Sequence, residues 1–358
     1  MKLYLVINTL ECGGAERYVQ NIARCMTKRG HDVTVVVFDN SAQHYPIDGA
    51  QVLDLGERGW RSLWGRIVKL RRLVKRGKPD VVLAVQNTVN MTAIVATLGL
   101  PVTVVTKEDM LPFDTLWLAR RLYWIIYRFA DGVICVSRKI KGQLIALGVS
   151  RHLCMVIHNP VDCELVREQS FEYEPLNGWE CMPWLVSVNN LSWYKDYDTL
   201  LRAFAAVVDK LVCGLVVIGS GPQQERLERL RSELGLRAYV RFIGTRDNPF
   251  PYMRRAAIAV SSSISEGFPH CMTEAMACGT PVVCTSVGWT DDIITDGVDG
   301  VIVPPRDPNA MAKAILDLMR DYQRRKAIGL AGQNRARDFD IDAICEKHER
   351  YFGILGVK

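Results

Sequence analysis

The sequence predicts an α/β fold made of two doubly wound, Rossmann-like domains in tandem. Short Val- and Ile-rich apolar runs alternate with segments of helical length along almost the whole chain, which is the pattern of repeated strand–helix–strand units. The apolar runs are continuous and do not alternate with polar residues, as is typical of parallel strands buried on both faces. A length of 358 residues suits two or three domains.

The apolar runs define the strands that we expect. In the first half of the chain they are Leu3–Asn8, Val33–Phe38, Val81–Val85, Val102–Thr106 and Val133–Val136. In the second half they are Trp184–Val188, Leu215–Ile218, Val240–Ile243, Ile258–Val260, Val282–Cys284 and Val301–Val303. Between the halves the alternation stops at Ile157–Asp162 and continues as a polar, Pro- and Gly-containing stretch over Glu172–Pro183. We therefore expect domains at 1–165 and 166–340, with a last helix in 341–358 that packs back on the first domain. An interdomain cleft would then lie at the carboxyl ends of the strands.

Composition excludes several classes of protein. Apolar residues make up 49% and charged residues 23%, which excludes a disordered or collagen-like chain. No apolar run approaches the roughly 20 residues of a membrane span. The start of the chain resembles a signal peptide for a few residues but lacks a small-residue cleavage site, so we interpret it as a strand. Eleven cysteines without a CxxC pair indicate reduced, buried thiols in a cytosolic protein and not a zinc or disulfide framework.

The most informative motif is Ser265–Val283, which follows an expected strand. Pro269 suits the first position of a helix, and the free N–H groups at such a helix start favour a phosphate. Glu266 lies in the loop and Glu274 one turn into the helix, so both carboxylates can accept hydrogen bonds from sugar or ribose hydroxyls. The alternative is an ordinary strand–loop–helix with two solvated glutamates.

This segment resembles the hallmark of glycosyltransferase family 4, E-G-x-P-x-x-x-x-E-A-x-A-x-G-x-P-V-V, at every fixed position. Other segments similar to those of the family are Gly13–Glu16, Ile157–Asp162, Gly219–Pro222, Phe242–Gly244 and Asp296–Val303. Taken alone, each of these is as compatible with a turn as with a site.

The resemblance implies a GT-B fold and a retaining transfer from a nucleotide-sugar, UDP-linked by family habit, with no cofactor and no bound metal. Matched by position, Glu274 would bind the ribose, Glu266 the hydroxyls of the donor sugar and Lys195 the diphosphate. The other donor-binding positions that it implies are Gly14, Asn190, Gly221, Gly244, Arg246, Gly267, Phe268, His270, Cys271, Met272 and Thr273. Cationic side chains and helix dipoles would stabilise the departing diphosphate.

Two positions depart from the family pattern. Asn190 stands where the family usually has an arginine, which would weaken leaving-group stabilisation by an amount on the order of a few kcal/mol. Arg246, Arg254 or Arg255 either compensates or is an ordinary surface arginine. Asp109 stands where many relatives have a histidine; it either orients the acceptor hydroxyl as a general base or is a solvated loop acid.

The net positive charge lies in the first half of the chain. Residues 1–165 hold 22 lysines and arginines against 14 acids, and the remainder holds 23 against 25, so the first half alone is expected to meet an anionic partner. Between Trp60 and Lys78 there are eight cations and no acid. On a helix, Leu63, Ile67, Leu70 and Val74 would dock on the domain. The opposite face would present Arg61, Lys69, Arg72 and Arg76 to anionic lipid, or simply to solvent.

A second segment, 116–129, mixes aromatic residues with arginines. It suits a helix in a membrane interface or a buried helix whose arginines extend to solvent. The residues concerned are Trp117, Arg120, Arg121 and Trp124. With the basic helix, they favour a peripheral enzyme on the cytoplasmic face of the inner membrane that acts on a polyprenyl-linked or surface glycan. No aromatic platform or motif supports nucleic-acid binding.

Four other functions share some of these features. A nucleotide-sugar epimerase has the same fold, and a non-catalytic glycosyltransferase-like binding protein would explain Asn190 and Asp109. A phosphorylase would need a pyridoxal-phosphate lysine site in a longer chain. A dinucleotide oxidoreductase is disfavoured because no G-x-G-x-x-G follows the first strand.

Overall fold

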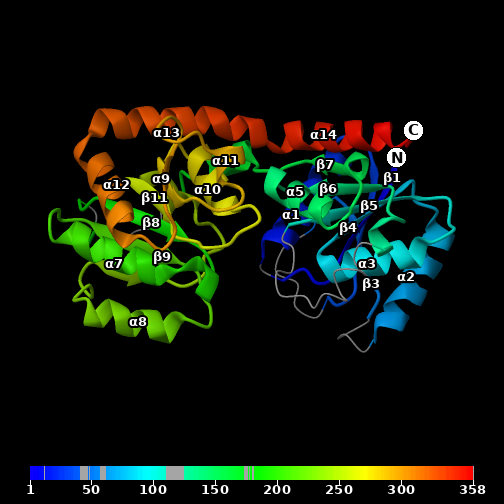
Figure 1. The fold of residues 1–358 in the computed structure, drawn as a ribbon, viewed down its shortest axis with the longest axis horizontal. Coiled ribbons are helices and arrows are strands. Elements are labelled where there is room, and N and C mark those ends of the chain that lie inside the picture. Colours follow the sequence, from blue (N-terminus) through cyan, green and yellow to red (C-terminus); the bar gives the residue numbers. More distant parts are fainter. Residues whose placement is uncertain are drawn as a thin grey trace. The chain divides into compact units, whose positions relative to one another are not determined.

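The computed structural model describes residues 1–11, 13–40, 47, 49–56, 62–109, 125–172, 176, 178–179 and 181–357. The chain forms two compact units (Figure 1). The first unit contains Met1–Pro160 together with Ile341–Lys358, and the second contains Val161–Asp340. The last helix of the chain therefore belongs to the first unit.

A seven-stranded parallel sheet forms the centre of the first unit, with the strand order β3-β2-β1-β4-β5-β6-β7. Its strands are β1 (Lys2–Ile7), β2 (Asp32–Val37), β3 (Gln51–Asp54), β4 (Val81–Val85), β5 (Thr103–Glu108), β6 (Gly132–Cys135) and β7 (Cys154–Val156). Its helices are α1 (Gly14–Lys28), α2 (Leu63–Gly77), α3 (Asn87–Thr97), α5 (Arg138–Ala146), the short turn η2 (Arg151–Leu153) and α14 (Ile341–Ile354).

Helices cover both faces of the first sheet. Leu3, Leu5 and Ile7 of β1 pack with α1 and α14, whereas Tyr4 and Val6 of the same strand pack with α2 and α3. Side chains alternate between the two faces of a strand, so β1 has to be apolar at every position. This explains the continuous apolar run in its sequence.

A six-stranded parallel sheet forms the centre of the second unit, with the order β10-β9-β8-β11-β12-β13. Its strands are β8 (Trp184–Val188), β9 (Gly214–Ile218), β10 (Val240–Phe242), β11 (Ile258–Ser261), β12 (Val282–Thr285) and β13 (Val301–Val303). Its helices are α6 (Cys163–Gln169), α7 (Tyr197–Val208), α8 (Gln224–Glu233), α9 (Phe250–Arg255), α10 (His270–Ala277), α11 (Thr290–Ile293), α12 (Pro308–Arg320) and α13 (Tyr322–Ala336), with the short turns η3 (Trp193–Lys195) and η4 (Arg337–Phe339).

The second sheet is also covered on both faces (Figure 1). Leu215 and Val217 of β9 share a core with Phe204 of α7, Leu227 of α8 and Ile315 of α12. Helix α10 packs against α6, α9 and α13. The predicted fold class, two doubly wound α/β domains in tandem, is confirmed.

All the expected strands are present, with ends within two residues of the expected ones. Two strands are absent from the prediction, β3 and β7, which are the two edge strands of the first sheet. Both are short, and the ends of β3, Gln51 and Asp54, are exposed. An edge strand needs no apolar run on both faces, so it leaves a weak sequence signal.

The predicted docking stripe of α2 is wrong at its first residue. Leu70 and Val74 are buried as expected, but Leu63 is 50% exposed. The buried contact of α2 begins one turn later, where the guanidinium of Arg66 lies 4.9 Å from the ring centre of Phe38. The first turn of α2 therefore projects beyond the core that the helix covers.

No helix within the described ranges is both long and apolar enough to cross a bilayer.

Candidate functional site

Each sheet changes its direction of growth at one central point. In the first sheet the point lies between β1 and β4, and in the second it lies between β8 and β11. Open parallel sheets bind their ligands beyond the carboxyl ends of the strands at such a switch point. The segments that follow these strands are therefore the candidate binding segments of each unit, taken separately.

Lys195 and Glu266 form an ion pair at the switch point of the second sheet. Lys195 ends the turn η3 after β8, Glu266 lies in the loop after β11, and Nζ of Lys195 donates to Oε1 of Glu266. Ser263 Oγ donates to the same oxygen at 2.5 Å. The two side chains are 11% and 5% exposed, so the pair is almost completely shielded from water.

Burial and pairing act in opposite directions on Lys195. Burial by itself lowers the pKa of the ammonium group, but the charge of Glu266 and its hydrogen bond outweigh burial and raise the pKa above its ordinary value. Lys195 therefore keeps its proton at neutral pH. A buried, permanently charged ammonium is a suitable group to meet a diphosphate.

Glu274 lies one turn into α10 and is 5% exposed. The start of this helix is tied to the loop after β8, because Cys271 Sγ donates to Oδ1 of Asn189 at 3.6 Å. Burial raises the pKa of the Cys271 thiol to about 12, so the thiol stays protonated and acts as a donor.

The other predicted positions around α10 offer backbone groups more than side chains. Gly267 and Phe268 are buried, and Met272 is 1% exposed. Thr273 Oγ1 donates to the carbonyl of His270 at 2.9 Å, so its hydroxyl is already used within the helix. A ligand at this helix start would therefore meet mainly backbone N–H groups.

Glycines pack the loops after β8, β9 and β10 backbone to backbone. A Cβ on Gly221 would lie 2.7 Å from the amide nitrogen of Leu191, and a Cβ on Gly219 would collide with the carbonyl of Asn189. Gly219 also has φ +134°, which favours glycine, and its N–H donates to the carbonyl of Gly244 at 2.9 Å. The predicted donor positions Gly221 and Gly244 therefore lie in closely packed loops at the carboxyl edge of the second sheet.

Asn190, at the position of the missing arginine, is exposed, and its Nδ2 donates to the hydroxyl of Tyr194 at 3.1 Å. Arg246 is also exposed. It follows Thr245, whose hydroxyl lies 3.1 Å from that of Ser220 in the neighbouring loop. Arg246 is thus attached to the same loop edge as the predicted donor site.

The other two arginines considered as replacements are stacked on aromatic rings. The guanidinium of Arg254 lies 4.0 Å from the ring centre of Phe171, and that of Arg255 lies 5.6 Å from the ring of Trp184. Such stacking holds a guanidinium in place. Arg246 is therefore the best placed of the three.

In the first unit, α1 begins at Gly14 directly after the loop that follows β1. A Cβ on Gly13 would collide with Oε2 of Glu16. Glu16 is buried, which raises its pKa, and its Oε1 accepts a hydrogen bond from Nε2 of Gln86 at 3.0 Å. Gln86 follows β4 with φ +85°. The segments after β1 and β4 are thus joined at the switch point.

Asp109 follows β5, and its Oδ1 accepts a hydrogen bond from Nζ of Lys107. Lys107 is fully buried. Asp109 was predictable from the sequence but this buried partner was not, because a lysine beside two acids in a loop-like sequence suggests a solvated cluster. Ser263 is also absent from the predicted site, although the run Ser261–Ser263 ends two residues before the motif.

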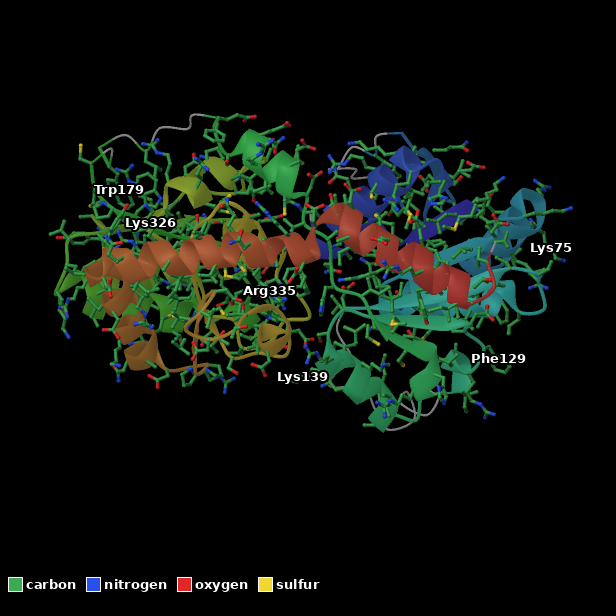
Figure 2. All side chains as sticks on the ribbon, turned by 90° about the horizontal axis from the view of Figure 1, so that it is seen from above. Lys75, Phe129, Lys139, Trp179, Lys326 and Arg335 are labelled. Atoms are coloured by element: carbon green, nitrogen blue, oxygen red, sulfur yellow. The ribbon has the colours of Figure 1, made fainter. Side chains whose placement is uncertain are left out.

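Of the predicted membrane residues, Lys69, Arg72 and Arg76 are exposed on α2, and Nζ of Lys69 donates to the carbonyl of Leu55 at 2.7 Å. Lys75 lies on the outer side of the same helix (Figure 2). The remaining members lie outside the described residues: Arg61, Trp117, Arg120, Arg121 and Trp124.

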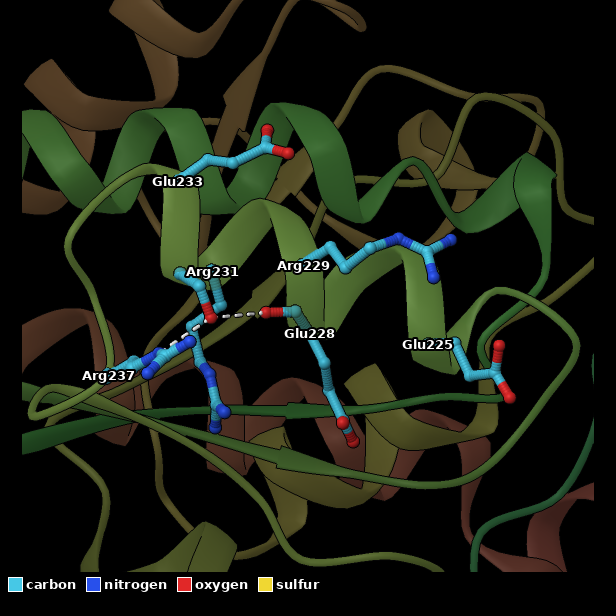
Figure 3. A pocket seen from close by; sticks show the side chains of 7 residues that line it. Glu225, Glu228, Arg229, Arg231, Glu233 and Arg237 are labelled. Atoms are coloured by element: carbon cyan, nitrogen blue, oxygen red, sulfur yellow. Dashed lines mark hydrogen bonds between the residues drawn. The ribbon is translucent and has the colours of Figure 1, made fainter.

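A hollow on α8 is separate from this site (Figure 3). Its lining residues are Glu225, Glu228, Arg229, Arg231, Ser232, Glu233 and Arg237. Arg237 Nε donates to Ser232 Oγ at 2.8 Å, and Ser232 donates to the carbonyl of Glu228 at 3.0 Å. None of the predicted site residues lines it, and its charges of both signs offset one another.

The part of the chain that the structure describes contains no group of three His, Cys, Asp or Glu side chains arranged to hold a metal ion.

Comparison with known families identifies the class of the protein. Residues 12–165 match the family model described as Glycosyltransferase Family 4, and residues 179–335 match the model described as Glycosyl transferases group 1. The two matches together span most of the chain. The protein therefore belongs to glycosyltransferase family 4 and has the GT-B fold.

Individual relatives are similar over nearly their full length. N-acetylgalactosamine-N,N'-diacetylbacillosaminyl-diphospho-undecaprenol 4-alpha-N-acetylgalactosaminyltransferase of Campylobacter jejuni is 24% identical, with 98% of this chain and 99% of that protein covered. The lipopolysaccharide core biosynthesis glycosyltransferase LpsE of Rhizobium meliloti is 24% identical, with 94% of each chain covered. The crystal structure of Anabaena Alr3699/HepE in complex with UDP-glucose superimposes with a TM-score of 0.87 over 99% of each chain, at 22% identity.

Proposed function

We propose that the protein is a retaining glycosyltransferase that moves a hexose or an N-acetylhexosamine from a UDP-sugar to a lipid-linked or cell-surface glycan. The observation that carries this proposal is the buried Lys195–Glu266 pair at the switch point of the second sheet, with Glu274 buried on the helix that follows the loop of Glu266. In this proposal Lys195 meets the diphosphate, Glu266 accepts hydrogen bonds from the donor sugar, and Glu274 accepts them from the ribose.

The transfer forms one bond and breaks one bond. The acceptor hydroxyl oxygen bonds to the anomeric carbon, and the bond from that carbon to the diphosphate oxygen breaks with its electron pair leaving on UDP. Lys195, with Arg246 in place of the missing arginine, offsets the charge that develops on the diphosphate. Asp109 accepts the proton of the acceptor hydroxyl.

The relatives support this choice of donor and acceptor. The Anabaena structure contains UDP-glucose, and the Campylobacter relative is named for an undecaprenol-diphosphate acceptor. The Rhizobium relative is named for lipopolysaccharide core biosynthesis.

We also propose a peripheral position on the cytoplasmic side of the inner membrane, and the exposed face of α2 supports the membrane contact. Trp64 is 77% exposed and Val68 is 40% exposed, next to the exposed cations Arg72, Lys75 and Arg76. An aromatic residue beside several cations suits a surface of anionic headgroups. Flotation with vesicles that contain phosphatidylglycerol tests this, with Trp64→Ser as the variant and neutral vesicles as the control.

The transfer itself is tested by measuring nucleotide release from a panel of UDP- and GDP-sugars, with and without a polyprenyl-diphosphate glycan and with EDTA. We expect acceptor-dependent release from one UDP-sugar, unaffected by EDTA, and a product with the anomeric configuration of the donor in its NMR spectrum. Interconversion of UDP-sugars without an acceptor would instead identify an epimerase. Binding without turnover of any donor would identify a non-catalytic binding protein.

A further inference from the structure

The first unit contains a buried lysine that the proposed transfer does not explain. Lys107 is fully buried at the end of β5, its Nζ donates to Oδ1 of Asp109, and it lies 4.1 Å from the ring centre of Tyr18. Within the described residues, Asp109 is the one anion that Lys107 pairs with.

A buried ammonium group is costly for the fold. Removing an ammonium from water costs several kcal/mol, and an ion pair recovers this only with very good geometry, so an apolar residue of similar size is often more stable. Burial lowers the pKa of Lys107, and the neighbouring Asp109 opposes this shift. Stability alone therefore gives no reason to keep a lysine in this position.

Two helices fix the aromatic ring of Tyr18, against which Lys107 lies. The hydroxyl of Tyr18 on α1 donates to Nε2 of His348 on α14 at 2.6 Å, while Nδ1 of His348 donates to the carbonyl of Ile344 at 2.8 Å. Tyr18 and His348 are completely buried. The ring beside Lys107 is thus fixed from α1 and α14.

Lys107 occupies only one of the two oxygens of Asp109. Oδ2 is buried and has no hydrogen-bond partner among the described residues. An unpaired buried carboxylate oxygen is costly unless a ligand completes it. The Asp109 side chain is 29% exposed, so part of this residue lies at the surface at the carboxyl edge of β5, next to the buried Oδ2.

We propose that Lys107 is a positioning residue that holds Oδ1 of Asp109, so that Oδ2 accepts a hydrogen bond from the attacking hydroxyl of the acceptor. This inference rests on the proposed function. A lysine in this position is costly for stability but useful for the reaction, because correct placement of a reacting hydroxyl contributes strongly to the rate.

A double-mutant cycle tests whether Lys107 acts through Asp109. The variants are Lys107→Met, Asp109→Asn and the two combined, with Lys139→Met as a control that removes an exposed cation from the same unit (Figure 2). The measurements are kcat and KM for the acceptor, the Kd of the UDP-sugar, and the circular dichroism spectrum. We expect Lys107→Met to lower kcat/KM for the acceptor about tenfold or more in the wild-type background, with the Kd of the donor unchanged.

In the Asp109→Asn background, the same Lys107→Met change should alter kcat/KM less than about twofold. An equal loss in both backgrounds would overturn the proposal, because it would mean that Lys107 supports the fold independently of Asp109. If Lys107→Met does not fold, Lys107→Gln keeps a hydrogen-bond donor for Oδ1 and replaces it in the same cycle. A wild-type protein without transferase activity would instead refute the proposed function before the cycle begins.

Discussion

Nζ of Lys195 donates a hydrogen bond to Oε1 of Glu266, and the two side chains form an ion pair. Each residue therefore neutralises the charge of the other. The family resemblance implies, however, that the two residues bind different parts of one donor. A nucleotide-sugar would offer new partners to both, namely phosphate oxygens for Lys195 and sugar hydroxyls for Glu266.

This pair makes a prediction about stability. Lys195→Met alone should lower the free energy of unfolding by about 3–5 kcal/mol, because it leaves the Glu266 carboxylate buried without its cation. The double variant Lys195→Met/Glu266→Gln should recover most of that loss. Urea unfolding of the two single variants and the double variant measures this, and losses that simply add would show that the pair is not coupled.

Gly221 provides a second prediction. A Cβ there would lie 2.7–2.8 Å from the backbone of Leu191, so Gly221→Ala should displace the loop after β8. We expect a stability loss of about 1–3 kcal/mol and weaker UDP binding by calorimetry. Gly142→Ala on α5 is the control, because its Cβ meets nothing within 4 Å, and it should leave stability equal or slightly higher. Equal effects of the two variants would contradict the close packing of the Gly221 loop.

We predict that Arg246 supplies the positive charge of the family's usual arginine, whose position is occupied here by Asn190. Arg246→Ala should raise the Kd of UDP about tenfold, as expected for the loss of a charge-assisted hydrogen bond. Arg254→Ala should leave the Kd nearly unchanged, because that guanidinium stacks on Phe171. Titration of both variants with UDP measures this. A larger effect at Arg254 would mean that the wrong cation has been assigned.

Because His348 is buried, we predict that the free energy of unfolding depends on pH. Burial lowers the pKa of this histidine to about 4, whereas in the unfolded chain it is ordinary, near 6.5. The unfolded state therefore binds the proton first as pH falls. The contribution of His348 is fully present above about pH 6.5 and is lost progressively toward pH 4.

The measurement is the free energy of unfolding of the wild type and of His348→Gln, each at pH 7.5 and at pH 5. His348→Gln can still accept the hydrogen bond from Tyr18 but does not titrate, so its stability should fall less between these values. Glu349, whose hydrogen bond from Arg29 lowers its pKa to about 2, responds below about pH 4.5 and leaves this comparison intact. An identical pH response in both proteins would exclude His348 as its source.

The sequence was sufficient to predict the elements whose local pattern is strong. The central strands are apolar at every position because both faces are covered, and the Glu266–Glu274 motif lies on one loop and the helix after it. The residues of this motif are close together in the chain, so their placement needs little tertiary information.

Long-range partners could not be predicted in this way. Tyr18 and His348 are 330 positions apart, and nothing in the sequence near either residue indicates the other. Lys107 illustrates the same limit, because a lysine beside Glu108 and Asp109 has the composition of a solvated loop. Lys107 packs against Tyr18 of α1, and Tyr18 in turn is hydrogen-bonded to His348 of α14, so its surroundings come from opposite ends of the chain.

Sugar transfer by Glu274→Ala tests the central claim most directly. The measurement is acceptor-dependent release of UDP by the wild type, by Glu274→Ala and by Glu228→Ala, a control on α8 outside the site. We predict a loss of about 100-fold or more in kcat/KM for Glu274→Ala, with wild-type rates for Glu228→Ala. Unchanged transfer by Glu274→Ala would contradict the assignment of the donor site to the second sheet.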